Sequence, residues 1–395
     1  MAPSHERAAD FDVVFVGGGL ASVLASLALL ERRPELRLAI VERGARLGGN
    51  HTWCFHAADV PASASQLVAP LIVQSWPGYE VRFPRRTRRL ASGYACISSA
   101  RLHEVGSARF GQAPGSELLL GQSARELGAD RVLLDDGREL AAKLVVDARG
   151  PTLGEPSKPE QRGRRGYQKF VGLELRVAPH TLREPLMFDA CIEQRDGFRF
   201  MYVLPLSSDR VLVEETFFSE HARLDEESGR RAILEYAAKR GLSVLEVLRV
   251  ERGVLPMPWH DPPFDIRARP LAAGYRAGLF HPVTGYSFPL AIRFALALAA
   301  SDLARLESSP LAAFARAHAE QRPFLHFLTR LLFTCFAPAQ RFSVLEHFYR
   351  LPEPVIERFY AAELRPLDRA RVFIGAPPRG FSVGRAFGFQ SGVAE

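Results

Sequence analysis

Apolar and polar positions at the start of the chain follow the order of a strand, a turn, a helix and a second strand. Residues 11–16 form an apolar run rich in β-branched side chains, which predicts a strand buried on both faces. Three glycines at 17–19 end it, a helix is predicted to begin near Leu20, and a second strand over 36–41 ends at Glu42. Glycines let the backbone approach a phosphate closely, and the positive end of the helix dipole attracts that phosphate. The pattern therefore predicts a Rossmann-type dinucleotide site.

Two residues refine this prediction. Glu42 stands at the distance downstream at which a carboxylate binds a ribose hydroxyl, which favours FAD or NAD over NADP. Ser22 stands where the fingerprint usually has glycine or alanine, so the tightness of the first turn is open. A second glycine turn and a strand that stops at Asp147 are expected to face the same crevice. The predicted nucleotide-binding residues are Gly17, Gly18, Gly19, Leu20, Ala21, Ser22, Glu42, Arg43, Gly49, Asn50, His51, Thr52, Trp53, Asp147, Ala148, Arg149 and Gly150.

The pattern changes after residue 56. Residues 57–99, with four prolines, look like an insertion that leaves the nucleotide fold. Residues 101–150 return to it, with a helix end and loop at 102–110 and strands at 131–134 and 143–146. A period of two then predicts an antiparallel sheet. Its strands are expected at 169–177, 186–193, 198–206, 210–218 and 247–255, beside a helix at 225–240.

The last part of the chain is predicted to be helical. A glycine-rich turn precedes a long apolar helix within 271–300, whose N-terminus would point at the far end of the cofactor. Ser309 and Pro310 predict an N-cap and a first-turn proline, and later prolines, including Pro323, are expected to divide the rest into short helices. Aromatic residues here are expected in the core; the alternatives are lining a lipophilic tunnel or meeting a membrane. They are Phe324, Phe327, Phe333, Phe336, Phe342, Phe348 and Tyr349.

Composition adds limits on the kind of protein. The 395 residues can bury a large core, and 27 phenylalanines suit either an apolar cavity or a phenylalanine-rich core. Four dispersed cysteines indicate neither a zinc site nor a disulfide framework, so no metal and a reducing cytoplasm are expected. The N-terminal residues lack the apolar segment of a signal peptide. The most apolar stretch, 286–300, is interrupted by Arg293, so no membrane span is expected.

The net charge of +7 is concentrated in arginine clusters at 82–89 and 162–165. No recognised nucleic-acid module accompanies them, so nucleic acid is not an expected partner. A basic surface beside apolar side chains would instead hold the protein against anionic lipids. We therefore expect a cytoplasmic protein that associates peripherally with a membrane surface.

The most suggestive polar residues outside the nucleotide site are Glu214 and Glu215, in the segment VLVEETFFS. Successive side chains of a strand point to opposite faces, so the two carboxyls cannot both face one reactant. A carboxyl in an apolar cavity keeps its proton, because burial raises its pKa, and can act as a general acid near neutral pH. The alternative is a solvated carboxylate, or one paired with Arg199 or Arg210.

Several stretches, in order along most of the chain, resemble the bacterial flavin-dependent lycopene β-cyclases and are also similar to plant lycopene cyclases. They are DVVFVGGGLAS at 12–22, GGNHTWCFH at 48–56, VVDARG at 145–150, FRFMYVLPLSSDRVLVEET at 198–216, GVLPMP at 253–258 and AGLFHPVTGYSFPLA at 277–291. The GNHTW, EET, LPMP and HPVTGYS pieces are far more specific than the glycine turn.

The resemblance implies reduced FAD, with NAD(P)H as an external reductant, and isomerisation of lycopene and then γ-carotene without net electron transfer. A proton is added at the terminal double bond of the ψ end, the neighbouring double bond attacks the resulting cation, and proton loss gives a β-ionone ring. Such a site must exclude water and stabilise a cation.

The family's pattern also assigns roles to residues. The EET motif supplies the essential carboxylate, Glu214 by preference and Glu215 as second choice, although the reduced flavin could instead deliver the proton. The flavin-side turn comprises His281, Pro282, Thr284, Gly285, Tyr286 and Ser287.

The expected fold is α/β (α+β), a Rossmann-type FAD-binding domain with an inserted antiparallel-sheet substrate domain and a helical C-terminal region. Their predicted ranges are 1–56, 100–165 and 268–308 for the FAD-binding domain, 57–99 and 166–267 for the substrate domain, and 309–395 for the helical region. Two other functions fit the same fold. One is a flavin monooxygenase or prenyl-chain reductase, disfavoured because Gly278-Leu279-Phe280 stands where those enzymes have Gly-Asp. The other is a non-catalytic flavin-bearing carotenoid-binding protein.

Overall fold

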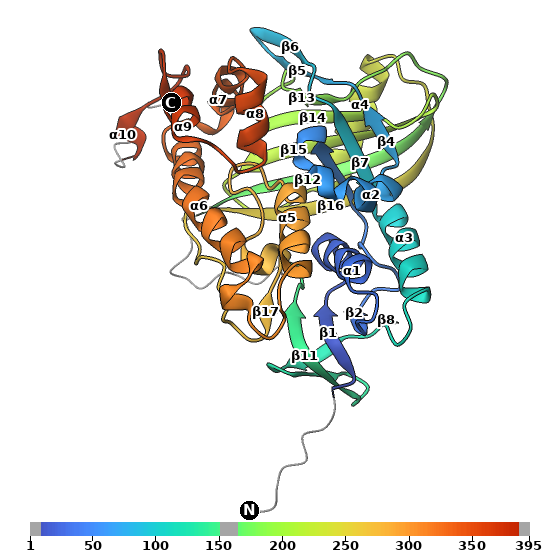
Figure 1. Ribbon diagram of the computed structural model, residues 1–395. Coiled ribbons are helices and arrows are strands. Elements are labelled where there is room, and N and C mark those ends of the chain that lie inside the picture. The colour runs from blue at the N-terminus through green and yellow to red at the C-terminus, as the bar shows by residue number, and fades with distance from the viewer. Residues whose placement is uncertain (1–8, 151–164, 387–395) are drawn as a thin grey trace, which may run out of the picture.

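The computed structural model describes residues 9–150 and 165–386, so part of the arginine cluster at 162–165 lies outside the described residues. Two large sheets lie one above the other in Figure 1, with the nucleotide-type sheet below and the antiparallel sheet above. Helices α5 and α6 run beside both of them. This arrangement confirms the predicted α/β fold with a Rossmann-type part and an antiparallel sheet.

The lower sheet is parallel at its centre, in the order β8-β2-β1-β11, with β17 also paired to β11. Strands β10 and β9 extend it in antiparallel pairing beyond β11. Its strands are β1 (Phe11–Val16), β2 (Leu38–Glu42), β8 (Glu117–Leu120), β9 (Ala124–Leu127), β10 (Arg131–Leu134), β11 (Glu139–Asp147) and β17 (Leu271–Ala272). All six residues of β1 are buried, which explains why five of them are apolar; the exception, Asp12, pairs with Lys143. Helix α1 (Leu20–Arg32) packs against α5 (Phe288–Ala299) over this sheet.

The upper sheet has the order β16-β12-β15-β14-β13-β5-β6, and only its β13–β5 pair is parallel. Its strands are β5 (Tyr79–Phe83), β6 (Arg86–Leu90), β12 (Arg165–Val177), β13 (Leu186–Asp189), β14 (Phe198–Pro205), β15 (Arg210–Ser219) and β16 (Val244–Pro258). Period-two alternation predicted the five strands of the chain's middle part. Strands β5 and β6 come from the irregular stretch 57–99 and join the far edge of this sheet.

A third, small sheet connects the two layers, with the order β3-β7-β4. Its strands are β3 (Thr52–His56), β4 (Gln74–Trp76) and β7 (Tyr94–Ser98), and the short helix α2 (Ser65–Val68) lies between β3 and β4 in the chain. Because β3 follows directly from the second glycine turn, this sheet connects the nucleotide fold to the upper sheet.

Two helix predictions were wrong. The stretch 102–110 is not a helix end and loop but most of α3 (Ser99–Gly111), which begins where the Ser98 hydroxyl accepts a hydrogen bond from the backbone N–H of Arg101. Pro323 does not end a helix, because α6 (Pro310–Thr334) continues through it with Ser309 as its N-cap. Buried residues on both sides of Pro323 pack this helix into the core, which outweighs the roughly 3 kcal/mol that an interior proline costs.

The remaining helices are α4 (Glu226–Lys239), α7 (Phe342–Phe348), α8 (Glu353–Tyr360), α9 (Pro366–Phe373) and α10 (Val383–Ala386). Helix α4 covers one face of the upper sheet, and α6 and α7 pack on other parts of it. A Cβ atom at Gly166 of β12 would collide with the ring of Phe333 in α6, so helix and strand are in direct contact. Arg341, fully buried after α6, donates a hydrogen bond to the Leu332 carbonyl and pairs with Glu220 beyond β15.

Most of the aromatic side chains predicted for the core are buried or partly buried, but Phe327 is 48% exposed. In the part of the chain that the structure describes, no helix combines the length and apolar character needed to cross a membrane.

Candidate active site

The glycine turn after β1 is shaped by the end of β11. Gly17 has φ +102°, and a Cβ atom there would lie 2.7 Å from the carbonyl oxygen of Ala148. The backbone N–H of Ala148 in turn donates to the Val16 carbonyl at 2.9 Å. The Asp147 carboxylate forms an ion pair with the guanidinium of Arg149 at 2.8 Å. The predicted residues after β11 therefore lie against the turn, and only glycine fits at its first position.

Ser22 closes this turn. Its buried hydroxyl donates a hydrogen bond to the Gly17 carbonyl at 2.5 Å. The residue that departs from the usual glycine or alanine therefore adds a contact to the turn, because its polar atom is satisfied inside the fold.

The residues around the turn fit a dinucleotide. Glu42 accepts hydrogen bonds from the N–H groups of Gly18 and Gly44, both at 2.7 Å, and its partly exposed carboxylate has further lone pairs for a ribose hydroxyl. No side chain of the described residues caps the N-terminus of α1, so the N–H groups of its first turn remain available to a phosphate. A Cβ atom at Gly19 would meet nothing within 4 Å, which leaves space in front of that terminus.

A second helix terminus, that of α5, faces the upper sheet. Its N-cap residue Ser287 makes no capping bond in the described structure, and the backbone of Gly285, at φ +69°, packs against Gln168 of β12. The Gln168 Oε1 atom is buried and has no hydrogen-bond partner among the described residues. An unpaired buried acceptor at this junction is the kind of atom that a ligand N–H would satisfy.

The turn before α5 has a buried and an accessible half. His281, Pro282, Thr284 and Gly285 are buried, whereas Tyr286 and Ser287 keep accessible surface. Burial lowers the pKa of His281 to about 3, so its imidazole is neutral at physiological pH. The Tyr286 hydroxyl donates to Asp59 at 2.7 Å, which ties this turn to the segment after β3.

The second glycine turn reaches the upper sheet. Asn50 donates to the Val250 carbonyl of β16 at 2.6 Å, and Arg249 donates to Asn50 at 3.1 Å and to Thr52 at 2.8 Å. Its neighbours His51 and Trp53 are partly buried, whereas Gly49 and Arg43 are exposed. The contacts of Asn50 and Thr52 thus join the two layers of the protein.

The two adjacent glutamates of β15 lie on opposite faces of the upper sheet. Glu214 pairs in register with Tyr202 of β14 and Gly172 of β12, and shares its face with Thr216, whose hydroxyl donates to it. Glu215 lies on the α4 side, where a Cβ atom at Gly229 of α4 would lie 3.4 Å from it. Alternation along a strand therefore separates the two carboxyls, as expected.

Glu215 is an ion-paired, buried carboxylate. It is 2% exposed, accepts a hydrogen bond from Arg199 at 2.6 Å, and lies 3.3 Å from a guanidinium nitrogen of Arg195. Two guanidinium groups therefore balance the charge of Glu215 on this face.

Glu214 has no ion pair in the described structure, and its environment favours the neutral acid. Burial, and after it the negative charge of Glu251, raise the pKa of Glu214 to about 8, against a smaller opposing effect of the Thr216 hydroxyl. At pH 7 such a carboxyl keeps its proton in roughly nine molecules of ten. The side chain also keeps part of its surface accessible, unlike Glu215. Glu214 can therefore act as a general acid at neutral pH.

Sequence reasoning missed the residues around Glu214 that come from other strands. Tyr202 and Glu251 reach it through sheet register, which local patterns do not give, whereas Thr216 lies two residues along the same strand. Only Glu251 left a signal, as a charged residue inside a strand next to the GVLPMP motif. Cys54 and Cys96 lie opposite each other on β3 and β7 as free thiols, and Cys54 is close to the Tyr202 side chain.

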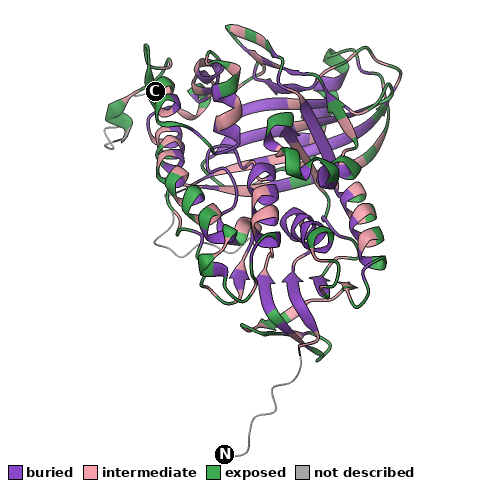
Figure 2. Cartoon of the chain, viewed as in Figure 1, coloured by how far each residue is buried: buried purple, intermediate pink, exposed green. Residues whose placement is uncertain are grey.

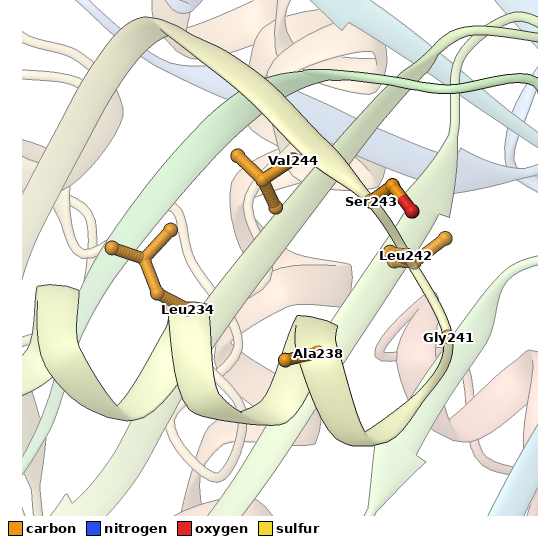
Figure 3. Close-up of a pocket in the computed structure, with 6 residues that line it drawn as sticks. All are labelled: Leu234, Ala238, Gly241, Leu242, Ser243 and Val244. Carbon is orange, nitrogen blue, oxygen red and sulfur yellow. The ribbon is translucent and has the colours of Figure 1, made fainter.

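A pocket of about 420 Å³ lies away from this arrangement, between the end of α4 and the start of β16 (Figure 3). It is on the side of the sheet that carries Glu215. Its lining consists of Leu234, Ala238, Gly241, Leu242, Ser243 and Val244. With no titratable side chain it offers no acid–base chemistry. The described residues contain no group of three or more histidine, cysteine or carboxylate side chains placed to hold a metal ion.

Comparison with known proteins finds relatives that match most of this chain. The family model described as lycopene cyclase protein matches residues 12–386. The chain is 40% identical to the lycopene β-cyclase of Pantoea ananas, over 93% of this chain and 95% of that protein. It is 37% identical to the lycopene β-cyclase of Paracoccus sp. (strain N81106 / MBIC 01143), over 93% and 94%. These relatives do not favour the two alternative functions.

Solved structures share the fold at low sequence identity. PqsL of Pseudomonas aeruginosa, described as a probable FAD-dependent monooxygenase, is 20% identical, with a TM-score of 0.59 over 84% of this chain and 98% of that one. A geranylgeranyl bacteriochlorophyll reductase-like protein of Thermoplasma acidophilum is 13% identical, with a TM-score of 0.59 over 92% and 95%. Both support the Rossmann-type architecture.

Proposed function

Because the chain belongs to the lycopene cyclase family and acts as a lycopene β-cyclase, we propose that Glu214 is the acid that starts its reaction. The single observation that carries the proposal is the difference between the neighbouring carboxyls. Glu214 keeps its proton and has accessible surface, whereas Glu215 is paired with Arg199 on the other face. Glu215 then serves to hold α4 and the sheet together.

The reaction needs one proton at the start and returns one at the end. Glu214 gives its proton to the terminal double bond of a ψ end, and a tertiary cation forms on the chain. The neighbouring double bond attacks that cation, a carbon–carbon bond closes the six-membered ring, and loss of a ring proton leaves the β-ionone double bond. No electron is gained or lost, and Glu214 recovers a proton from the ring or from solvent. The substrates proposed are lycopene and then γ-carotene.

We further propose FAD as the cofactor, in its reduced form and with NAD(P)H as external reductant. The N-terminus of α1 and Glu42 would hold its diphosphate and ribose, and the turn before α5 would hold the flavin end. When bound, reduced FAD would supply a negative surface that stabilises the developing cation. The residues of the chain orient the polyene end, exclude water from it and hold the proton at a Glu214 carboxyl oxygen.

Pigment chromatography of cells that make lycopene tests the proposal. The unmodified protein is expected to convert lycopene into β-ring products, and Glu214→Gln is expected to lower the conversion rate about 10²- to 10⁴-fold, the usual contribution of a general acid. Glu246→Gln, at an exposed ion pair of β16, is the matched control and should keep full activity. Ring formation by folded, flavin-loaded Glu214→Gln at the unmodified rate would contradict the role of Glu214.

We propose that the protein is cytoplasmic and associates peripherally with a membrane. The proposed contact surface is the outer side of the C-terminal helices. Of the ten exposed large apolar side chains of the described residues, six come from this region, and they define an outer patch. The patch comprises Phe327, Leu367, Phe373, Ile374, Phe381 and Val383. In Figure 2 the described chain of α9, α10 and the segment between them is largely coloured as exposed. Residues 365–385 contain five arginines and a single acid, Asp368, which is buried against Arg358.

Apolar side chains among arginines match the surface of an anionic bilayer. Cosedimentation with vesicles containing phosphatidylglycerol is expected, with much weaker binding to pure phosphatidylcholine. The double variant Leu367→Gln and Ile374→Gln should lose most of this binding, whereas Leu245→Gln, at a 66% exposed leucine of β16, should not. Equal binding by both variants would contradict the outer patch as the contact.

A further inference from the structure

Glu214 belongs to a row of four residues that crosses the upper sheet. Tyr202 of β14 is opposite Glu214, Glu214 is opposite Gly172 of β12, and Gly172 is opposite Glu251 of β16. Residues directly opposite each other in a sheet point to the same face, so both carboxyls lie on one face with a glycine between them.

Gly172 leaves the space in which the two acids approach each other. A Cβ atom at this position would lie only 2.9 Å from Cγ of Glu251. The Glu251 side chain therefore lies over the backbone of Gly172, toward β15. Any larger residue at position 172 would separate the Glu214 and Glu251 side chains.

Glu251 is held in place by groups on its far side. It is 3% exposed, lies 2.8 Å from a guanidinium nitrogen of Arg249, and accepts a hydrogen bond from Thr52 at 3.2 Å. Arg249 also binds Glu174 at 3.0 Å. The cation thus touches Glu251 and leaves Glu214 without a positive partner in the described structure. Burial raises the pKa of Glu251 as well, but the Arg249 cation acts against that rise, which makes the two carboxyls unequal.

We propose that Glu251 is a positioning residue of the reaction, a fixed carboxylate whose negative charge, facing Glu214 across Gly172, keeps the proton on Glu214. The proposal rests on Glu214 being the acid. Ionising Glu214 would place a second negative charge beside Glu251 on a buried face, and this like-charge repulsion disfavours the ionised form. Transfer of the proton leaves a carboxylate next to a carboxylate, so the same repulsion opposes the transfer itself. The two negative charges then attract the cation that forms on the polyene end.

Other titratable groups lie around this pair, but none of them replaces Glu251. On its own face they are Glu174 of β12, Arg249 of β16, Tyr202 of β14, Tyr94 of β7, Cys54 of β3 and His51 of the second glycine turn. Tyr202 and Tyr94 are neutral at physiological pH because burial raises their pKa values further above 10. Burial likewise raises the pKa of the Cys54 thiol. The cations Arg195 and Arg199 lie on the opposite face with Glu215.

A purely structural role predicts something different. Glu251 also helps to join β16 to the second glycine turn through Thr52, so its loss would weaken that contact. Weaker contact lowers stability or activity at every pH. It does not move the pH at which Glu214 loses its proton.

The test is the titration of Glu214 in flavin-loaded protein. The protonated-carboxyl C=O band in the infrared spectrum is assigned by its loss in Glu214→Gln, and the pH profile of cyclisation is measured in parallel. In the unmodified protein both are expected to have a midpoint near pH 8. Glu251→Gln should lower both midpoints by roughly one unit or more. Glu251→Asp moves the carboxylate back by one methylene, so its midpoints should lie between those of the unmodified protein and of Glu251→Gln. Glu246→Gln should not move either midpoint.

An unchanged midpoint in folded Glu251→Gln, or in Glu251→Asp where only that variant folds, would overturn the proposal while leaving Glu214 as the acid. Cyclisation at the unmodified rate by Glu214→Gln would instead remove the acid itself, and with it the reason for the pair. Failure of the Glu251 proposal and failure of the Glu214 proposal would therefore give different results.

Discussion

The two faces of β15 carry adjacent carboxyls with opposite properties. Both glutamates lie in the protein interior, yet Glu215 touches two arginines, whereas the charged neighbour of Glu214 is another carboxylate. Burial is the largest cause of the raised pKa of Glu214, and the negative charge of Glu251 adds to it. The sign of the neighbouring charge thus differs between the two faces, and register across β12 and β16 brings Glu251 to the Glu214 face.

Removing the paired carboxylate should have the largest effect on stability. Glu215→Gln leaves Arg199 buried without its counter-charge, so we expect the free energy of unfolding to fall by about 3–5 kcal/mol. Urea unfolding followed by circular dichroism measures it. A loss below about 1 kcal/mol would show that the ion pair is not the feature that distinguishes this face.

Glu214→Gln, one residue earlier, should raise the free energy of unfolding at alkaline pH rather than lower it. The pKa of Glu214 is raised from 4.5 to about 8 in the folded state, so between these values the unfolded chain loses its proton first and stability falls as pH rises. Glu214→Gln removes this titration. At pH 9 the free energy of unfolding of this variant should exceed that of the unmodified protein by on the order of a few kcal/mol. Near pH 4 the two free energies should agree. Parallel curves at both pH values would contradict the raised pKa.

Activity should follow the same proton. Above pH 8 the fraction of protonated Glu214 falls about tenfold per unit, and the rate of ring formation should fall with it. A pH series on flavin-loaded enzyme, with product measured by chromatography, checks this slope. A rate that stays constant from pH 7 to pH 10 would mean that another group gives the proton.

The smallest effect concerns the glycine turn. Ser22→Ala removes the hydrogen bond to the Gly17 carbonyl and should cost about 1 kcal/mol of unfolding free energy. Ser26→Ala is the matched control, because Ser26 is equally buried in α1 and its hydroxyl has no partner among the described residues. That variant should be neutral or slightly stabilising. Equal losses in both would mean that the Ser22 bond does not stabilise the turn.

Local pattern was enough for much of this fold. The run at 11–16, the glycines after it and Glu42 stand where the sequence places them, because each element there depends on neighbours in the chain. The extent of α3 and the continuity of α6 through Pro323 depend on packing against distant segments, so they were missed. For the site, alternation separated Glu214 from Glu215, but the charge beside each comes from other strands. Gly172 and Glu251 became visible only when register placed them in one row. The individual site roles and the domain limits stay predictions.

The contact between Phe333 and Gly166 fixes α6 directly on β12, the strand next to the one that carries Glu214. The buried Arg341 adds a second attachment close to β15. If the outer patch rests on a bilayer, α6 then sets the tilt of the catalytic sheet relative to the lipid plane, with no flexible hinge between anchor and chemistry. A long, stiff polyene leaving the lipid would meet the acid at an angle that the protein itself determines.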